Sequence, residues 1–141
     1  MNNAVTLPPQ QAWLEAFVTE HQGVAGTVHQ RTAVDDLELV AALNIPPPVQ
    51  QIVARVPRGK GMAGLAYEKN KPISTCNIKT DSTGQVRPGA RAVNAQAAVA
   101  LPVVDAHGQV RAVVGIAFHD EKELSESELV SLGDAAASLP V

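Results

Sequence analysis

Apolar positions follow strand and helix periods along most of the chain. Five alternating or continuous apolar runs predict strands, and these are residues 23–32, 37–45, 72–77, 97–104 and 110–119. Four stretches with helical spacing or helix-start signals predict helices, and these are residues 8–22, 49–56, 61–69 and 125–139. The order α-β-β-α-α-β-β-β-α, with hairpins between strands, predicts an α+β domain around an antiparallel sheet.

Local signals near the C-terminus define one hairpin and one helix start. The four residues 105–108 end in glycine and predict the loop that joins the last two strands. Ser125 and Glu128 have the spacing of a capping box, and Leu124 is placed to pack on Leu129. A helix is therefore expected to begin at Ser125.

Length and composition predict one domain without covalent cross-links. The chain has 141 residues, and we expect a tail over residues 1–8 followed by a single domain over 9–141. The single cysteine, Cys76, excludes an internal disulfide and a cysteine-rich zinc site. The first ten residues have no signal-peptide pattern, and every apolar run is shorter than the about 20 residues that span a membrane. We therefore expect a cytoplasmic protein with no membrane partner.

Charge is distributed unevenly along the chain. The net charge is −3 and only 3% of residues are aromatic, which argues against a nucleic-acid partner. Residues 55–91 hold eight basic and two acidic side chains, a local charge of +6. The remaining residues hold three basic and twelve acidic side chains, a local charge of −9. The positive segment predicts a preference for anions.

A glycine-rich segment in the middle of the chain opens a series of ordered motifs. Residues 56–66 have the sequence Val-Pro-Arg-Gly-Lys-Gly-Met-Ala-Gly-Leu-Ala. The later motifs are Lys71-Pro72-Ile73, Asn77-Ile78, Asp81, Ala98-Val99-Ala100-Leu101-Pro102-Val103, Gly108, Val114-Gly115-Ile116 and the helix start at Leu124. Over roughly residues 12–139, this series resembles GAF domains, which are small-molecule-sensing modules of signalling proteins.

The resemblance implies an architecture and a function. It implies a central antiparallel sheet of five to six strands in the order 2-1-5-4-3, with the terminal helices on one face. A ligand pocket is implied on the other face, under the segment that follows the third strand. We therefore expect a sensory or regulatory module that acts in signal transduction through a homodimer, formed by the terminal helices, or through a partner protein.

The glycine-rich segment has a second interpretation that its context disfavours. Residues 59–64 fit G-x-G-x-x-G, and Asp81 lies about where a ribose-binding carboxylate would lie in a dinucleotide site. Such a site needs a buried parallel strand directly before the glycines and a βαβ unit around them. Pro57 interrupts the preceding segment, which has helical spacing. We expect the glycines to allow a tight turn and close packing of the next helix onto the sheet.

Candidate ligand-binding residues cluster around the expected pocket. They are Tyr67, Cys76, Asn77, Lys79, Thr80, Asp81, Arg87, Arg91 and His29. Lys79, Arg87 and Arg91 fall in the segment that the resemblance places over the pocket, and arginine binds carboxylate and phosphate well. An anionic small molecule is one hypothesis for the ligand. The alternative is a solvated loop in which Asp81 pairs with an arginine.

Catalysis is not indicated. Cys76 could be the thiol of a redox enzyme like the GAF proteins that reduce free methionine sulfoxide, but those proteins use several cysteines. The other interpretation is that Cys76 is a small, half-buried structural residue. Bilin-binding GAF domains attach pigment through a cysteine commonly followed by histidine, whereas Asn77 follows Cys76. A third hypothesis for the whole chain is a dimerisation module without a ligand.

Metal, haem and cyclic-nucleotide sites are not expected. The histidines at 21, 29, 107 and 119 lack ligand spacing on one helix, and no catalytic triad or carboxylate pair stands out. Cyclic-nucleotide GAF domains carry Asn-Lys and a distant Phe followed after three residues by Asp-Glu. Asn70-Lys71 is present here, but residues 118–121 place a single residue between Phe and Asp-Glu.

Overall fold

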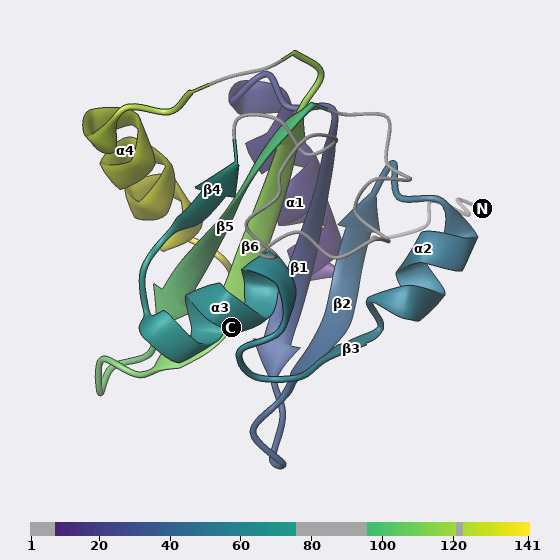
Figure 1. Ribbon diagram of the computed structural model, residues 1–141, viewed down its shortest axis with the longest axis vertical. Helices are drawn as coiled ribbons and strands as arrows, with labels where there is room; N and C mark the ends of the chain where they lie inside the picture. Colours follow the sequence, from purple (N-terminus) through teal and green to yellow (C-terminus); the bar gives the residue numbers. More distant parts are fainter. Residues whose placement is uncertain (1–7, 76–95, 121–122) are drawn as a thin grey trace, which may run out of the picture.

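A six-stranded antiparallel sheet carries helices on both faces (Figure 1). The computed structural model describes residues 8–75, 96–120 and 123–141. The helices in these ranges are α1 (Pro9–Glu20), α2 (Pro47–Ile52), α3 (Gly61–Lys69) and α4 (Glu126–Ala136). The strands are β1 (Ala25–Arg31), β2 (Leu37–Leu43), β3 (Arg55–Val56), β4 (Ile73–Thr75), β5 (Ala97–Val104) and β6 (Val110–Phe118).

The sheet has the order β3-β2-β1-β6-β5-β4. This confirms the expected 2-1-5-4-3 arrangement of the five predicted strands and adds β3 at one edge. The first strand, β1, lies in the middle because it pairs with both β2 and β6. Its register against β6 places Gly26 opposite Ile116 and Thr27 opposite Gly115.

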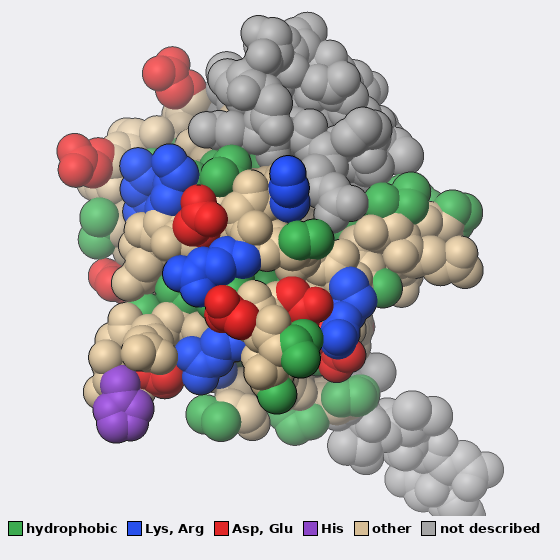
Figure 2. All heavy atoms as spheres, turned by 60° about the horizontal axis from the view of Figure 1, so that its bottom comes forward, with side chains coloured by type: hydrophobic (Ala, Val, Ile, Leu, Met, Phe, Trp, Pro, Cys, Tyr) green, Lys and Arg blue, Asp and Glu red, His purple; other side chains and the backbone are tan. Residues whose placement is uncertain are grey.

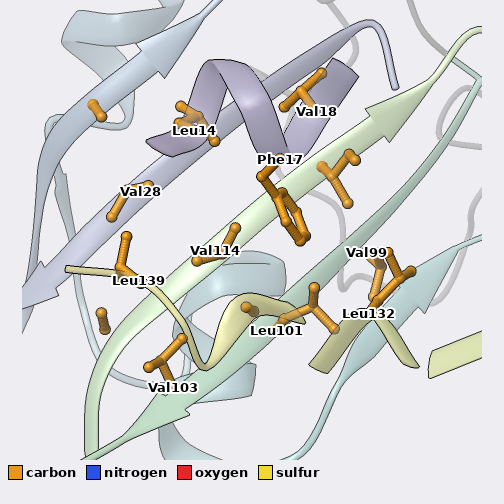
Figure 3. Packing of buried hydrophobic residues seen from close by; sticks show 14 of the residues in the cluster. Leu14, Phe17, Val18, Val28, Val99, Leu101, Val103, Val114, Leu132 and Leu139 are labelled. Atoms are coloured by element: carbon orange, nitrogen blue, oxygen red, sulfur yellow. The ribbon is translucent and has the colours of Figure 1, made fainter. Parts of the chain in front are cut away.

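The terminal helices α1 and α4 cover one face, as expected. Leu14, Phe17 and Val18 of α1 and Leu132 of α4 are buried against the sheet (Figure 3). The approach of α1 is close, since a Cβ atom on Gly26 would lie 2.7 Å from Cγ2 of Val18. Glycine at this strand position is therefore what lets α1 rest on the backbone of β1.

The capping box at the start of α4 is confirmed, but the helix is shorter than predicted. The Glu128 amide donates to Oγ of Ser125 at 3.1 Å, and the Ser125 amide donates to Oε1 of Glu128 at 3.2 Å. The helix ends at Ala136 rather than at residue 139, just before Pro140. The residues after the helix are held by Arg111, whose Nη2 donates to the Leu139 carbonyl at 2.6 Å.

The helix predicted over residues 49–56 is wrong at its C-terminal end. The helix α2 stops at Ile52, and Arg55 and Val56 form β3, paired with Glu38 and Leu37 of β2. Pro57 disfavours helical backbone at the residue before it, and the sheet edge offers that residue hydrogen-bond partners instead. The last hairpin also differs, since its loop spans 105–109 and closes with the Asp105 amide donating to the Gln109 carbonyl at 2.7 Å.

The glycine-rich segment forms a tight turn into α3, as predicted. Gly59 and Gly61 have φ angles of +82° and +66°, which glycine adopts without strain. A Cβ atom on Gly64 would lie 2.5 Å from the Pro57 carbonyl oxygen, so the turn packs directly on the first residues of α3. The close contact of Gly64 is with this preceding loop rather than with the sheet.

Candidate functional site

A cavity of about 150 Å³ lies between the sheet and the two short helices α2 and α3. Figure 1 shows α3 in front of the sheet, α2 beside β2 and α1 behind the sheet. The cavity is thus on the face opposite the terminal helices, where the family resemblance implied a ligand pocket.

Small side chains form the floor of the cavity. Alternate residues of three neighbouring strands point to this face, and those that line the cavity are Ala25 and Thr27 of β1, Ala98 and Ala100 of β5, and Gly115 and Ala117 of β6. Because none is larger than threonine, the sheet surface is hollow at this point. Further along β6, the larger Val113 packs instead with the cluster that holds α3.

The walls of the cavity are apolar. Val49 and Val53 from α2 and its C-terminal end line one side, and Met62 and Ala63 from the first turn of α3 line another. Val49 is buried against Ala25, which ties α2 to the floor. Two helices therefore bound the site, and each contributes only a short apolar face.

His29 is the buried polar residue of the site. It lines the cavity from β1 with 3% of its surface exposed. Its Nε2–H donates to the Val53 carbonyl at 2.8 Å, because a carbonyl oxygen can only accept. This bond joins the central strand to the corner between α2 and β3, so His29 helps to position the outer wall.

Charge at the cavity is positive in the described residues. Lys60, the residue before α3, lines the cavity and is exposed, and none of the described lining residues is acidic. The start of α3 lies at the same place and has no side-chain cap, so its partial positive charge has the same sign. The arrangement suits a ligand with an apolar body and a neutral or negative polar group.

Tyr67 lies in α3 but not at the cavity. Its ring is 5% exposed within the cluster around α3, and its hydroxyl donates to Oδ1 of Asp35 in the β1–β2 turn. Arg58 donates from Nη1 to Oδ2 of Asp35 at 3.0 Å and places its guanidinium 5.2 Å from the Tyr67 ring centre. Three segments of the chain therefore meet at one hydrogen-bonded cluster.

The two acidic groups of this cluster shift in opposite directions. The hydrogen bond from Tyr67, followed by that from Arg58, holds the pKa of Asp35 below its ordinary value of 3.8. Burial of the ring, followed by the hydrogen bond to Asp35, raises the pKa of Tyr67 above 10.0. Both shifts favour the charge states that the cluster needs at neutral pH.

Part of the positive segment is neutralised by acidic residues from β2 and the turn before it. Arg55 lies 3.1 Å from Glu38 and 3.5 Å from Asp36, and Arg58 pairs with Asp35. Figure 2 shows basic and acidic side chains interleaved across this end of the molecule. The local charge of +6 in the sequence therefore overstates the positive surface around the glycine-rich segment.

The structure describes two of the nine predicted ligand-binding residues. His29 lies at the cavity and Tyr67 does not, whereas the others lie outside the described residues, and these are Cys76, Asn77, Lys79, Thr80, Asp81, Arg87 and Arg91. Within the described ranges, no three His, Cys, Asp or Glu residues are grouped as a metal site. No helix of the described chain is long and apolar enough to cross a membrane.

Sequence reasoning missed the floor residues and Lys60. A signal for the floor was present, since small residues occupy alternate positions in three separate strands: Ala25 and Thr27, Ala98 and Ala100, and Gly115 and Ala117. Its meaning depended on knowing that these strands are neighbours.

Comparison with known proteins assigns the family. The family model described as GAF domain matches residues 11–139. No curated protein sequence matches the chain. Among solved structures, the GAF domain region of a putative membrane protein from Geobacter sulfurreducens has a TM-score of 0.75 at 11% identity, covering 92% of this chain and 86% of that one.

Two further structures have the same fold. The type II free methionine-R-sulfoxide reductase from Thermoplasma acidophilum is 17% identical with a TM-score of 0.70, and covers 92% of this chain and 87% of that one. The GAF domain of a phosphoenolpyruvate-protein phosphotransferase from Coxiella burnetii is 18% identical with a TM-score of 0.69, covering 94% and 83%. At these identities the likeness concerns the fold alone. The family match over residues 11–139 shows that the chain belongs to the GAF domain family.

Proposed function

We propose that this GAF domain is a sensory or regulatory module that binds a small molecule in the cavity between the sheet and helices α2 and α3. The observation that carries the proposal is the cavity of about 150 Å³ itself, with its floor of small side chains on three strands. A packed core ordinarily leaves few voids of this size. The hollow is therefore the natural place for a ligand.

The proposed output lies on the other side of the sheet. The helices α1 and α4 pack on the face opposite the cavity, so a change in the central strands reaches them directly. Trp13 of α1 donates from Nε1 to Oγ of Ser138, just beyond α4, at 2.9 Å, which joins the two terminal segments. We propose that these helices pass the signal on, through a homodimer or a partner protein.

The test of ligand binding is a thermal-shift screen of a small-molecule library, using a variant whose cavity is filled. Ala117→Leu adds three carbon atoms on the cavity floor, and Ala16→Leu makes the same change at an exposed position of α1. A ligand at 100 times its Kd stabilises the native state by about 2.7 kcal/mol. We expect ligands that stabilise the wild type and the Ala16→Leu variant but not the Ala117→Leu variant. Stabilisation that survives Ala117→Leu would contradict the proposed site.

The positive residues that follow β4 in the sequence are part of the same proposal. We propose that Lys79, Arg87 and Arg91, in the segment that the family resemblance places over the pocket, add affinity for an anionic ligand. Arg87→Ala and Arg91→Ala should then weaken binding without changing the melting temperature of the unliganded protein. Unchanged affinity in both variants would contradict this part of the proposal and leave the cavity as the site.

The redox alternative has a separate test. Two of the similar folds are free methionine-R-sulfoxide reductases, and that activity would here require Cys76. We propose binding rather than turnover, because the described lining of the site is mainly apolar and its polar side chains are those of Thr27, His29 and Lys60. Reduction of free methionine sulfoxide by the wild type, lost in a Cys76→Ser variant, would overturn this choice.

A further inference from the structure

We infer that the ligand of this cavity is a compact, mainly apolar molecule with a single anionic group, such as a small aromatic or branched aliphatic carboxylate. The inference rests on the proposed function and names the chemical class of ligand. Its basis is the size of the cavity, the apolar character of its lining and the position of its charge.

Size is the first constraint. An apolar cavity of about 150 Å³ accommodates a molecule of about six non-hydrogen atoms, the size of benzene. The cavity here has this volume. A nucleoside with its phosphate is several times larger, so the hollow would hold only a fragment of it.

The lining is the second constraint. The floor and walls present methyl and methylene groups, from alanines of three strands, from Val49 and Val53, and from Met62. Buried polar atoms of a ligand need hydrogen-bond partners, and leaving one unpaired costs about 1–3 kcal/mol. In the described lining the interior polar side chains are those of Thr27 and His29, and His29 already bonds the Val53 carbonyl. A sugar or a nucleobase would bring more polar atoms than these partners satisfy.

The position of the charge is the third constraint. Lys60 is exposed and lies at the cavity beside the first turn of α3, and no acidic residue is among the described lining residues. A ligand can therefore bury its apolar body against the floor and direct an anionic group to the solvent-facing ammonium group. The apolar body of the ligand would thus contact the floor, and its anionic group would lie at Lys60.

The experiment measures Kd values for four probes with the full chain by isothermal titration calorimetry or ligand-observed NMR. The probes are benzoate, benzamide as its neutral isostere, inorganic phosphate, and cyclic GMP. We expect benzoate to bind, benzamide to bind about threefold more weakly, as suits an exposed ion pair, and phosphate and cyclic GMP not to bind. Ala117→Leu should abolish benzoate binding, and Ala16→Leu should not.

Lys60 has its own matched control. Lys60→Met should reduce the preference for benzoate over benzamide, whereas Lys69→Met, at the exposed far end of α3, should leave the threefold difference intact. A Lys60→Met variant that keeps the full preference for benzoate would overturn the assignment of the anionic group.

The outcomes separate this inference from the proposed function. Suppose that phosphate or cyclic GMP binds, that benzoate does not, and that Ala117→Leu abolishes the binding observed. This result would overturn the ligand class and leave the cavity as a binding site. Binding of benzoate that Ala117→Leu does not affect would overturn the inference, because the probe would then bind elsewhere. Failure of all four probes would also overturn the inference, whereas the proposed function fails only if the library screen finds no ligand that Ala117→Leu excludes.

Discussion

Tyr67 and Asp35, 32 residues apart in the sequence, are joined by a hydrogen bond from the phenol to the carboxylate. The bond connects α3 to the turn between β1 and β2, where Asp35 has a φ angle of +64°. The first turn of α3 lines the cavity. The bond between Tyr67 and Asp35 therefore holds in place the helix that forms one cavity wall.

Removing the hydroxyl should loosen this connection. In Tyr67→Phe the ring still fills its place in the cluster around α3, but the Asp35 carboxylate loses the hydrogen bond from the phenol and keeps the one from Arg58. We expect the melting temperature to fall by a few degrees at pH 7, measured by circular dichroism. Equal melting temperatures for the two proteins would show that the bond does not stabilise the fold.

The same pair predicts a pH dependence. The pKa of Asp35 is lowered in the folded protein, so its contribution to stability is present above its ordinary value of 3.8 and is lost as the pH falls through the folded value. The stability difference between wild type and Tyr67→Phe should therefore be constant near neutral pH and shrink in acid below about pH 4. A difference that does not shrink as Asp35 becomes protonated would mean that the hydroxyl stabilises the fold by something other than its bond to the ionised carboxylate.

Gly26 should tolerate no side chain. In Gly26→Ala, the new methyl group would lie 2.7 Å from Cγ2 of Val18 and 3.0 Å from the Gly115 carbonyl oxygen, so α1 must shift. We expect a loss of about 1–3 kcal/mol in the free energy of unfolding. The emission of Trp13, the single tryptophan, should change as α1 moves.

Gly133 provides the matched control for this substitution. It lies within α4, and a Cβ atom there would meet nothing within 4 Å. Gly133→Ala should stabilise the protein by about 0.5–1 kcal/mol, because alanine loses less conformational entropy in a helix. If both variants lose the same stability, close packing at Gly26 is not the cause.

Loss of the capping box should weaken α4. Ser125→Ala removes the acceptor for the Glu128 amide and should lower the free energy of unfolding by about 1 kcal/mol in urea denaturation. Ser131→Ala makes the same change at an exposed position inside α4 and should have little effect. A larger loss for Ser131→Ala would contradict the role assigned to the cap.

A residue that can donate a hydrogen bond to the Val53 carbonyl should partly replace His29. His29→Leu leaves the Val53 carbonyl without this hydrogen bond and should lower the free energy of unfolding by about 1 kcal/mol. His29→Gln can donate from its amide, so we expect it to recover part of the loss. Equal stability of the two variants would show that the bond to Val53 does not hold the corner after α2.

Much of the fold could be predicted from short-range patterns. Continuous apolar runs located β5 and β6. The ends of α3 match the prediction, because the glycines before it and Asn70 after it adopt left-handed conformations. The sheet order came from the family resemblance, since no local pattern states which strands are neighbours. The end of α2 was missed because the pairing of β3 with β2 competes with the helical spacing of residues 49–56.

The sequence by itself determined the order of helices and strands apart from β3, the capping box of α4 and the resemblance to a family, since each depends on residues close together in the chain or on motifs in a set order. Only the tertiary structure decided that Tyr67 bonds to Asp35, that the arginines near the glycine-rich segment are paired, and that Lys60 lies at the cavity. The physical reason is that such contacts join residues distant in sequence. The cavity itself exists because three strands place their smallest side chains side by side.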